Sequence, residues 1–526
     1  MYSSSLTRRS LVVACMLASV LAINRTYELT LTNEFIQPDG FNRSSVLANR
    51  KFPGPLISAY KNDRLKVNIV NRLTNITMAQ GTSIHWHGLF QNKTASQDGV
   101  AWITQCPISP GEDFLYDFNV GEQAGTFWYH SHVTTQYCDG LRGPLVVYDK
   151  EDPHGLMYDV DDESTIITLG DWLHLPSPQG WRDFENPQST VINGLGRLPN
   201  NTDTPLTVVG VDLGRRYRFR IINTACISSF NFSIDHHKLT VIEADGIETH
   251  PITVDVLPIY AGQRYSVVVQ ANQKVDNYWI RAIPQFVGVQ PVNETGVNAA
   301  ILRYNGSESV EPQSLQNGTE SLLEQDLVPW VSSDLASRNP DMSINLEIGH
   351  SGHDFTINNK TFRPPSIPVL LQILNGTLDP LSVMPNGSVI VLPRNKLISV
   401  SIPGGLVNAP HPFHLHGHSF EVIRSAGSNV TNLINPPIRD VVNTGLRGDN
   451  VTILFRTDNP GPWIFHCHID YHLEAGLAVV FAEDPEGQRS GPDAVGTPPD
   501  WEALCPKWNS LKNGTQYSVN DDLVQP

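Results

Sequence analysis

The sequence lacks three features that would each have indicated a different class of protein. Beyond the first 22 residues it has no apolar run long enough to span a bilayer, and long amphipathic helix patterns are scarce. Basic residues are in the minority, with 36 Lys and Arg against 53 Asp and Glu, which gives a formal net charge of -17. Because nucleic acids and anionic membranes would repel this charge, we expect neither as a partner.

The amino terminus predicts a secreted protein. Arg8 and Arg9 precede an apolar run over residues 11–21, which is too short for a membrane span, and Ala22 is suited to signal-peptide cleavage. We therefore expect residues 1–22 to be a signal peptide and the rest of the chain to be an extracellular monomer. Asn-X-Ser/Thr sequons recur and predict a glycoprotein; examples begin at Asn42, Asn75, Asn231, Asn375 and Asn513.

Cysteine is scarce, and its number is informative. Of the six cysteines, Cys15 lies in the signal segment, so the mature chain keeps Cys106, Cys138, Cys226, Cys467 and Cys505. In an oxidising compartment, four of these can form two disulfides, with three possible connectivities. We expect the unpaired one to be Cys467, because its histidine neighbours give it another role.

Short strand patterns run through the whole chain. Alternating or β-branched segments, bounded by Gly, Pro, Asn or Asp, occupy residues 27–32, 65–70, 217–222 and 265–269. Many short strands at this spacing predict an all-β protein made of sandwiches or barrels.

The length of 526 residues suggests about three domains. A polar turn that feeds a strand recurs in each third of the chain, which supports an internal repetition. We place boundaries near residue 150, in an acidic segment that contains proline, and near residue 320, in a polar stretch. The expected domains are 23–150, 151–320 and 321–526.

Ten of the 18 histidines lie in four short clusters, namely His85 and His87; His130 and His132; His411, His414 and His416; and His466, His468 and His472. A lone buried histidine is usually a core residue, but four clusters in one chain favour metal binding. On a strand, residues i and i+2 point to the same face, so each His-X-His pair aims two imidazoles in one direction. Four pairs supply too many ligands for one zinc ion, and therefore predict a group of metal ions shared between two domains.

Cys467 lies between His466 and His468 and must point away from both. His411 and His472 are the clustered histidines outside the His-X-His pairs, and one thiolate with two imidazoles is the ligand set of a blue-copper centre. The two sites would lie about 10 Å apart on opposite faces of one strand. This coupling favours copper over zinc, and predicts that single electrons pass from a mononuclear copper to a polynuclear copper centre that reduces O₂.

The motifs in and around the clusters resemble those of the multicopper oxidases, and most closely those of the secreted fungal laccases. They read HWHG at 85–88, HSH at 130–132, HPFHLHGH at 411–418 and HCHIDYHLEAGL at 466–477, beside HVTTQYCDGLRGP at 132–144, INGLGR at 192–197 and TDNPGPW at 457–463. The resemblance covers essentially the whole mature chain. It implies three cupredoxin-like Greek-key β-sandwich domains, with a trinuclear copper cluster between the first and the third.

The resemblance further implies four copper ions, one of type 1, one of type 2 and two of type 3. The ligands it assigns are His411, Cys467 and His472 for type 1; His85 and His414 for type 2; and His87, His130 and His468 with His132, His416 and His466 for the type 3 pair. It also implies the disulfides Cys106–Cys505 and Cys138–Cys226.

Leu477 lies ten residues after Cys467, where the family places the residue over the type 1 copper. Leucine cannot coordinate, so the resemblance implies a higher potential than a methionine would give. Ile469 is expected to pack on the other side of this copper.

Three acids have candidate roles near the copper ions. Asp98 follows the first copper motif, and the family places acids there that assist proton delivery to reduced oxygen. Asp440 and Asp470 are expected to orient ligands through hydrogen bonds.

The chain also departs from the family pattern. Many fungal laccases have an acid in the phenol pocket directly after the cysteine that matches Cys226, whereas this chain has Ile227. Phenol binding would then depend on His472 and on other loops. Tyr471, at a position where fungal laccases commonly have tryptophan, is a milder change.

The expected activity is that of a laccase, with one-electron oxidation of phenols or aromatic amines coupled to reduction of O₂ to water. One alternative is a ferroxidase or another multicopper oxidase; Ile227 counts against iron, which needs carboxylates near the type 1 copper. Another is a secreted copper-binding glycoprotein without enzyme activity, which would not need the bridge through Cys467.

Overall fold

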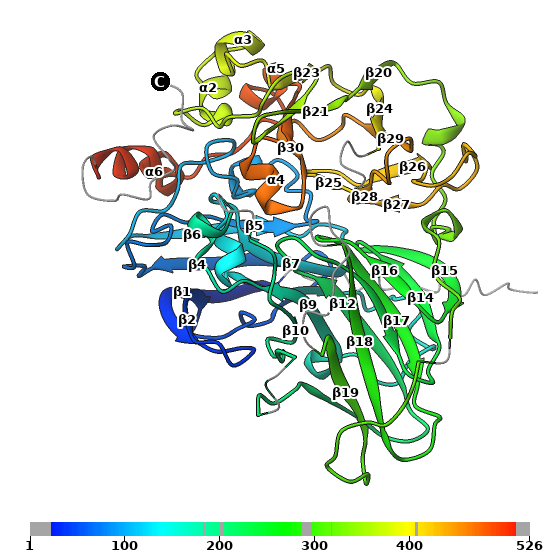
Figure 1. Ribbon diagram of the computed structural model, residues 1–526. Coiled ribbons are helices and arrows are strands. Elements are labelled where there is room, and N and C mark those ends of the chain that lie inside the picture. Colours follow the sequence, from blue (N-terminus) through cyan, green and yellow to red (C-terminus); the bar gives the residue numbers. More distant parts are fainter. Residues whose placement is uncertain are drawn as a thin grey trace, which may run out of the picture.

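The computed structural model describes residues 23–181, 185–199, 201, 203–286, 297–316, 318–404 and 409–511. The expected signal peptide lies outside these residues, as does the sequon at Asn513. The described chain is built mainly of β-strands, which form three cupredoxin-like domains (Figure 1). The prediction of an all-β fold with three such domains is confirmed. None of the helices in the described part of the chain has the length and apolar content needed to cross a membrane.

The first domain contains two four-stranded sheets, β2-β1-β4-β6 and β3-β8-β7-β5. In β4, every second residue is buried, because one face of the strand packs on the core and the other faces solvent. The strands are β1 (Asn24–Ile36), β2 (Arg43–Ala48), β3 (Ile57–Tyr60), β4 (Arg64–Asn71), β5 (Ile84–His87), β6 (Asp113–Asn119), β7 (Gly125–Ser131) and β8 (Arg142–Tyr148).

The second domain contains a six-stranded sheet, β10-β9-β12-β17-β14-β15, and a five-stranded sheet, β11-β19-β18-β13-β16. These sheets enclose a hydrophobic core of their own. The strands are β9 (Ile166–Trp172), β10 (Ser189–Ile192), β11 (Val208–Val211), β12 (Arg216–Asn223), β13 (Ser229–Ile234), β14 (Leu239–Ala244), β15 (Ile247–Val254), β16 (Leu257–Ile259), β17 (Arg264–Gln270), β18 (Asn277–Phe286) and β19 (Ala299–Tyr304).

The third domain contains two five-stranded sheets, β20-β24-β29-β26-β27 and β23-β31-β30-β25-β28, and the hairpin β21-β22. The strands are β20 (Met342–Asn345), β21 (Ile348–Ser351), β22 (Asp354–Ile357), β23 (Val389–Leu392), β24 (Leu397–Pro403), β25 (Pro412–Leu415), β26 (Phe420–Arg424), β27 (Ile438–Arg439), β28 (Val441–Asn443), β29 (Asn450–Arg456), β30 (Gly461–Cys467) and β31 (Ala478–Glu483).

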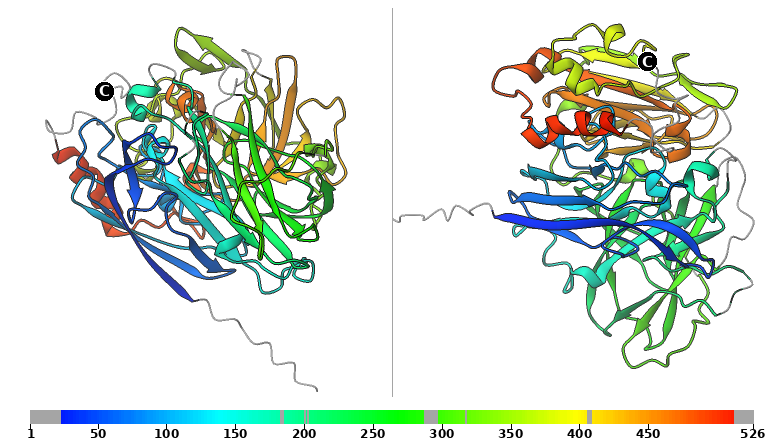
Figure 2. Two further views of the ribbon diagram at one scale, coloured as in Figure 1. Left: turned by 60° about the horizontal axis from the view of Figure 1, so that its bottom comes forward. Right: turned by 90° about the vertical axis from the view of Figure 1, so that its left-hand side faces the viewer.

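The α-helices are short and lie outside the sheets. They are α1 (Ser177–Gly180), α2 (Val369–Leu374), α3 (Pro380–Val383), α4 (Asp470–Glu474), α5 (Pro485–Arg489) and α6 (Pro499–Ser510). Although α6 comes after the last strand of the third domain, it lies against strand β6 of the first domain (Figures 1 and 2). The Cys106–Cys505 disulfide and an ion pair between Lys507 and Glu112 hold it there.

The first and third domains share much of one continuous hydrophobic cluster. A smaller cluster also joins Val100 and Ile103 of the first domain to Phe362 and Ile464 of the third. This extensive apolar contact brings the end of β5 and β7 close to the end of β25 and β30. The four strands carry the histidine clusters, so packing of the two domains is what brings those clusters together.

Candidate metal centre

Strands β5 and β7 present the histidines of the first domain. The two strands pair antiparallel, with His85 opposite His130. Between His85 and His87, the fully buried Trp86 points the other way and packs its ring against Tyr116 in the core of the domain. The alternation expected for a His-X-His strand is therefore present, and both imidazoles lie on the face toward the third domain.

Strands β25 and β30 present the histidines of the third domain. They also pair antiparallel, with His414 opposite His466. Across the domain boundary, Nδ1 of His87 lies 3.2 Å from Nε2 of His468. Within the third domain, the Nε2 atoms of His416 and His466 are 3.3 Å apart. Two nitrogens bound to one transition metal at about 2.0–2.1 Å each are separated by roughly this distance.

The eight histidines of the His-X-His pairs are buried and form three groups, two of which share His87; within each group, the donor atoms lie within 4.8 Å of one another. These groups are His85, His87 and His414; His87, His130 and His468; and His132, His416 and His466. Such a group of imidazoles, drawn from two domains, can hold more than one metal ion.

The hydrogen bonds of these rings show that they are prepared for metal. The Nδ1–H groups of His85, His130 and His414 donate to the backbone carbonyls of Asp98, Ser131 and Asp440, respectively, at 2.8–2.9 Å. Their Nε2 atoms, and that of His132, are buried without a hydrogen-bond partner. A buried lone pair without a partner is costly, so converging Nε2 atoms of this kind fit a bound cation.

The protonation state of these histidines also favours metal binding. Burial lowers the pKa values of His130, His132 and His414 well below the usual value for histidine, and neighbouring imidazoles lower them further. These rings are therefore neutral at physiological pH and offer lone pairs, which is the form that binds a metal.

A second donor group lies on the other side of β30. The Nδ1 atoms of His411 and His472 are 3.1 Å apart, and the Sγ of Cys467 lies 3.6 Å from each. Cys467 is fully buried and is the free cysteine of the described residues. Burial raises the pKa of its thiol, so a thiolate here needs an adjacent cation, and two imidazoles with one thiolate suit copper.

Leu477 and Ile469 are both buried near this group. The backbone N–H of Cys467 donates to the carbonyl of Leu477, and the N–H of Leu477 donates to the carbonyl of His472. These bonds hold Leu477 beside the three donors. The ring of Phe355, on β22, packs against both histidines of this group. Its centroid lies 4.6 Å from that of His472 and 5.7 Å from that of His411.

Asp98 is fully buried between two histidines of the cluster. Its Oδ2 accepts a hydrogen bond from Nδ1 of His416 at 2.9 Å. Its Oδ1 lies 3.2 Å from Nδ1 of His85, but that nitrogen donates to the backbone carbonyl of Asp98, which leaves Oδ1 without a partner. The carboxylate thus contacts two candidate ligands and keeps one oxygen available.

The other two predicted acids lie in different surroundings. Asp440 contacts the cluster, because its Oδ1 lies 3.4 Å from Nε2 of His87. Burial raises the pKa of Asp440 to about 6, against the opposing effect of Arg264. Asp470 instead lies against the Cys138–Cys226 disulfide, with its Oδ2 3.3 Å from Sγ of Cys138, and its N–H donates to the carbonyl of Cys226.

Ile227 lies in a turn organised by another acid. The carboxylate of Asp171 accepts the backbone N–H groups of Cys226, Ile227 and Ser228 at 2.7–2.9 Å. Asp171 is itself buried, so it holds the turn and does not replace the missing pocket acid. Tyr471 is also buried, and its hydroxyl is without a hydrogen-bond partner.

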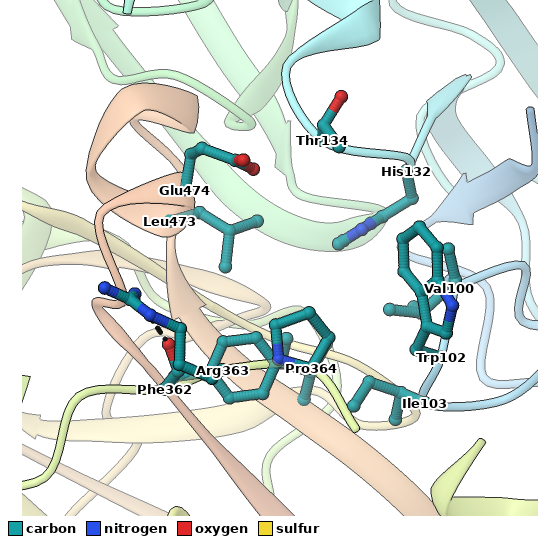
Figure 3. Close-up of a pocket in the computed structure, with 12 residues that line it drawn as sticks. Val100, Trp102, Ile103, His132, Thr134, Phe362, Arg363, Pro364, Leu473 and Glu474 are labelled. Carbon is teal, nitrogen blue, oxygen red and sulfur yellow. Dashed lines mark hydrogen bonds between the residues drawn. The ribbon is translucent and has the colours of Figure 1, made fainter. Parts of the chain in front are cut away.

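A small cavity reaches the cluster between the first and third domains (Figure 3). Its volume is about 50 Å³, and His132 forms part of its wall. Most of the lining is apolar, while Arg363 and Glu474 add charge; the apolar side chains include Val100, Trp102, Ile103, Phe362, Pro364 and Leu473.

A thiolate site joined by one strand to a histidine cluster, on three cupredoxin-like domains, defines a copper-dependent oxidoreductase. Models of the multicopper oxidase family match residues 30–152, 163–307 and 362–487. The chain belongs to the multicopper oxidase family, and copper is its cofactor.

Similar proteins include named laccases. The chain is 51% identical to laccase-5 of Trametes villosa over 507 residues, which covers 93% of this chain and 95% of the relative. It is also 51% identical to a laccase of Pycnoporus cinnabarinus over 498 residues, with the same coverage.

Solved structures agree in fold over nearly the whole chain. The laccase of Botrytis aclada superposes with a TM-score of 0.84 at 32% identity, covering 96% of this chain and 95% of that one. Fet3p, a multicopper oxidase that functions in iron import, superposes with a TM-score of 0.81 at 28% identity. The match covers 95% of this chain and 98% of Fet3p.

The residues that sequence reasoning missed belong to the second domain. Arg264 and Asp245 lie beside Asp440 and are fully buried. Neither lies in a recognisable metal motif, and their contacts form only when distant segments pack, so the local sequence pattern could not reveal them.

Proposed function

We propose that this chain is a secreted laccase. It takes single electrons from phenols or aromatic amines and transfers four of them to O₂, with two waters as products. The donor group of Cys467, which is joined through one strand to the histidine cluster, carries this proposal. The relatives named as laccases support it, since half of their residues are identical to those of this chain.

The proposed stoichiometry is four copper ions, and the donor groups described above support this number. We assign His411, Cys467 and His472 to type 1; His85 and His414 to type 2; and His87, His130 and His468 with His132, His416 and His466 to the type 3 pair. When bound, these ions supply the one-electron redox couples and the reduction of O₂.

Electrons enter at His472, the least buried of the three type 1 donors. His472 and the thiolate of Cys467 share one donor group, and Cys467 is bonded through the backbone to His466 and His468. Burial of Cys467 keeps water and external oxidants away from the sulfur. The protein thus separates the place where the organic donor reacts from the place where O₂ reacts.

Asp98 is proposed to deliver protons to the cluster. Its Oδ2 is anchored by His416, and its unpartnered Oδ1 is able to accept and pass on a proton at the cluster. Four protons are consumed for each O₂ reduced, so a carboxylate in contact with the ligands is chemically useful.

The cavity beside His132 is the proposed entry for O₂. Its volume and mainly apolar lining suit a small uncharged molecule, and it ends at a histidine of the cluster (Figure 3). The organic donor, in contrast, would approach on the side of Phe355 and His472.

We also propose domain limits of 23–150, 151–320 and 321–526, each of which includes one of the three sheet pairs. The signal sequence and the two disulfides support secretion. A monomer is proposed, and sedimentation of the purified protein tests it.

The activity is tested by O₂ uptake of the holoprotein with a phenol, Fe(II) and ascorbate in parallel. We expect a phenol rate well above background; rapid uptake with Fe(II) beside a background rate with phenol would instead establish a ferroxidase. A Cys467→Ser variant should lose its blue colour and activity while keeping part of its copper. Retained activity would refute the proposed electron path.

A further inference from the structure

The second domain supplies none of the proposed copper ligands, yet it reaches the cluster. Its residue Gly262 lies so close that a Cβ atom there would be 2.8 Å from Cδ2 of His468 and 3.1 Å from Cε1 of His87. Gly262 also has a φ of +87°, which favours glycine. The backbone of the second domain therefore forms part of the wall of the cluster.

Two residues after Gly262, Arg264 begins β17, and its side chain contacts Asp440 of the third domain. Its Nη1 donates to Oδ1 of Asp440 at 2.6 Å, and its Nη2 donates to Oδ2 at 2.7 Å. Its Nε donates to the backbone carbonyl of Thr126, on β7, the strand that carries His130. One fully buried guanidinium thus connects all three domains.

Asp440 transmits this contact to two proposed ligands. Its Oδ1 lies 3.4 Å from Nε2 of His87, whose other ring nitrogen, Nδ1, faces His468. Its backbone carbonyl accepts the Nδ1–H of His414 at 2.9 Å. The position of Asp440 therefore fixes the orientation of the type 2 ring of His414 through a hydrogen bond, whereas its approach to His87 is a close contact without a hydrogen bond.

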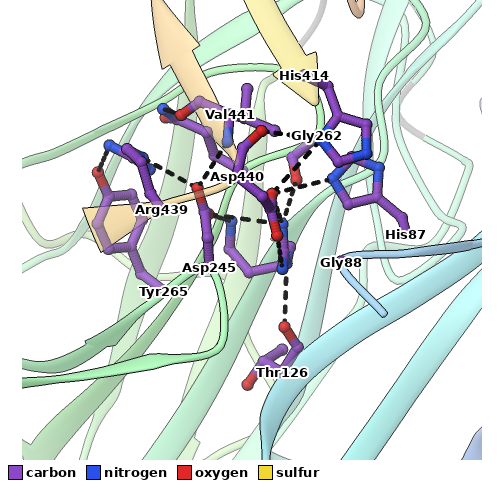
Figure 4. Close-up of polar contacts among 12 residues, drawn as sticks. His87, Gly88, Thr126, Asp245, Gly262, Tyr265, His414, Arg439, Asp440 and Val441 are labelled. Atoms are coloured by element: carbon purple, nitrogen blue, oxygen red, sulfur yellow. Dashed lines mark hydrogen bonds and ion pairs between the residues drawn. The ribbon is translucent and has the colours of Figure 1, made fainter. Parts of the chain in front are cut away.

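Asp245, also of the second domain, holds the same segment from its other side. Its Oδ1 accepts the backbone N–H of Arg264 at 2.8 Å, and its Oδ2 accepts Nε of Arg439 at 2.9 Å and the N–H of Val441 at 3.3 Å. Residues 439–441 are thus held between Arg264 and Asp245. Figure 4 shows Asp245 beside Arg439, Asp440 and Val441.

We propose that Arg264 is a positioning residue, through which the second domain sets the geometry of His414 and hence of the type 2 copper. This inference rests on the ligand assignment proposed above. The parallel two-point bond to Asp440 defines both the position and the plane of the carboxylate. Lysine retains the charge but can offer only a single point of contact, so it would leave Asp440 free to rotate.

The test compares Arg264→Lys with Arg218→Lys as a matched control. Arg218 is a buried arginine on the neighbouring strand β12, and it pairs with Asp152 and Glu243, away from Asp440. Both variants lose a buried arginine of the second domain, and only one of them affects the position of Asp440. The readouts are the type 1 and type 2 signals in electron paramagnetic resonance, copper per chain, and the melting temperature of the copper-free protein.

For Arg264→Lys we expect a weakened or shifted type 2 signal, with the type 1 signal and blue colour retained. The copper affinity of the type 2 site should fall about 10- to 100-fold, as for other residues that orient metal ligands. Arg218→Lys should keep both signals at wild-type intensity, even if its copper-free melting temperature falls as much.

An unchanged type 2 signal in Arg264→Lys would overturn the proposal, as would an equal loss in Arg218→Lys. Should Arg264→Lys not accumulate as folded protein, Asp245→Asn gives the same test, because the amide cannot maintain the ion pair with Arg439. A wild-type holoprotein without a type 2 signal would instead contradict the ligand assignment itself, so the two failures are distinct.

Discussion

The ring of His466 and the carbonyl of Cys467 are hydrogen bonded, with Nδ1–H donating to the oxygen at 2.9 Å. These neighbours belong to different donor groups, since the sulfur faces His411 and His472 whereas the ring of His466 faces His416. The sulfur and the histidine cluster are therefore linked both by the backbone and by a hydrogen bond. Both routes are internal to one short segment, so the link does not depend on domain movement.

Leu477→Met should lower the potential of the type 1 copper. Methionine can donate weakly to copper from this position, which stabilises Cu(II), whereas leucine cannot. Leu477 is buried, and an exchange of similar volume should cost less than about 1.5 kcal/mol in stability. A redox titration that follows the blue absorbance measures the shift.

Leu415→Met is the control for this substitution, because Leu415 is a buried leucine in the core, on the strand that carries His414. The redox potential of the type 1 copper in Leu415→Met should match that of the wild type. A potential for Leu477→Met that equals or exceeds the wild-type value would show that residue 477 does not face the copper.

Asp98→Asn should slow the reaction with O₂ about 100-fold or more, since the amide cannot carry protons between water and the cluster. The electron entry site is remote from Asp98, so reduction of the type 1 copper by a phenol should keep its wild-type rate. Stopped-flow measurement of reduction and of reoxidation separates the two steps. Equal slowing of both would argue that the substitution disturbs the whole protein.

Glu248→Gln should stabilise the protein at alkaline pH. Burial, with the nearby charges of Asp152 and Glu243, raises the pKa of Glu248 to about 7 in the folded protein. The folded state therefore binds this proton more tightly than the unfolded state, and stability is lost as pH rises from the unfolded pKa to about 7. The amide removes this loss.

The expected gain is about 1 kcal/mol at pH 8, because solvent reaches part of the carboxyl, and it should vanish near pH 4. Denaturant unfolding at both pH values measures it. Glu308→Gln, at an exposed position, should have no such effect. A gain of the same size at pH 4 and pH 8 would mean that ionisation of Glu248 is not the cause.

Removal of copper by a chelator, without reductant, should lower the melting temperature by roughly 5 °C or more. In the proposed assignment, His85, His130 and His414 would hold ions shared between the first and third domains, and without an ion the buried Nε2 atoms of these rings lack partners. Calorimetry before and after chelation measures the change, and added copper should restore it. An unchanged melting temperature after proven copper loss would contradict the bridging geometry.

Local sequence patterns are sufficient to predict the strands and the direction in which the paired histidines point. The alternation in β5 places His85 and His87 on one face and Trp86 on the other, as the two-residue period requires. The same period separates Cys467 from its neighbours, and it predicts two donor groups, as the structure has them. Short periods are visible in a sequence because the residues concerned share one strand.

The contacts that complete the site could not be predicted in this way. Asp98 and His416 are 318 residues apart, and Arg264 and Asp440 are 176 residues apart. Their pairing depends on how whole domains pack, and a charged residue at the end of a strand usually faces water. The sequence gives no sign that Arg264 is fully buried, because its partners are supplied by other domains.

The Cys106–Cys505 disulfide joins residues 399 positions apart and ties α6 to the first domain. During synthesis, the first domain is complete long before Cys505 leaves the ribosome, and His466 and His468 emerge only shortly before it. The cluster therefore cannot assemble while most of the chain is being made. The cluster can be completed only after these last histidines have been made, close to the point in the sequence where Cys505, the partner of Cys106, is also added.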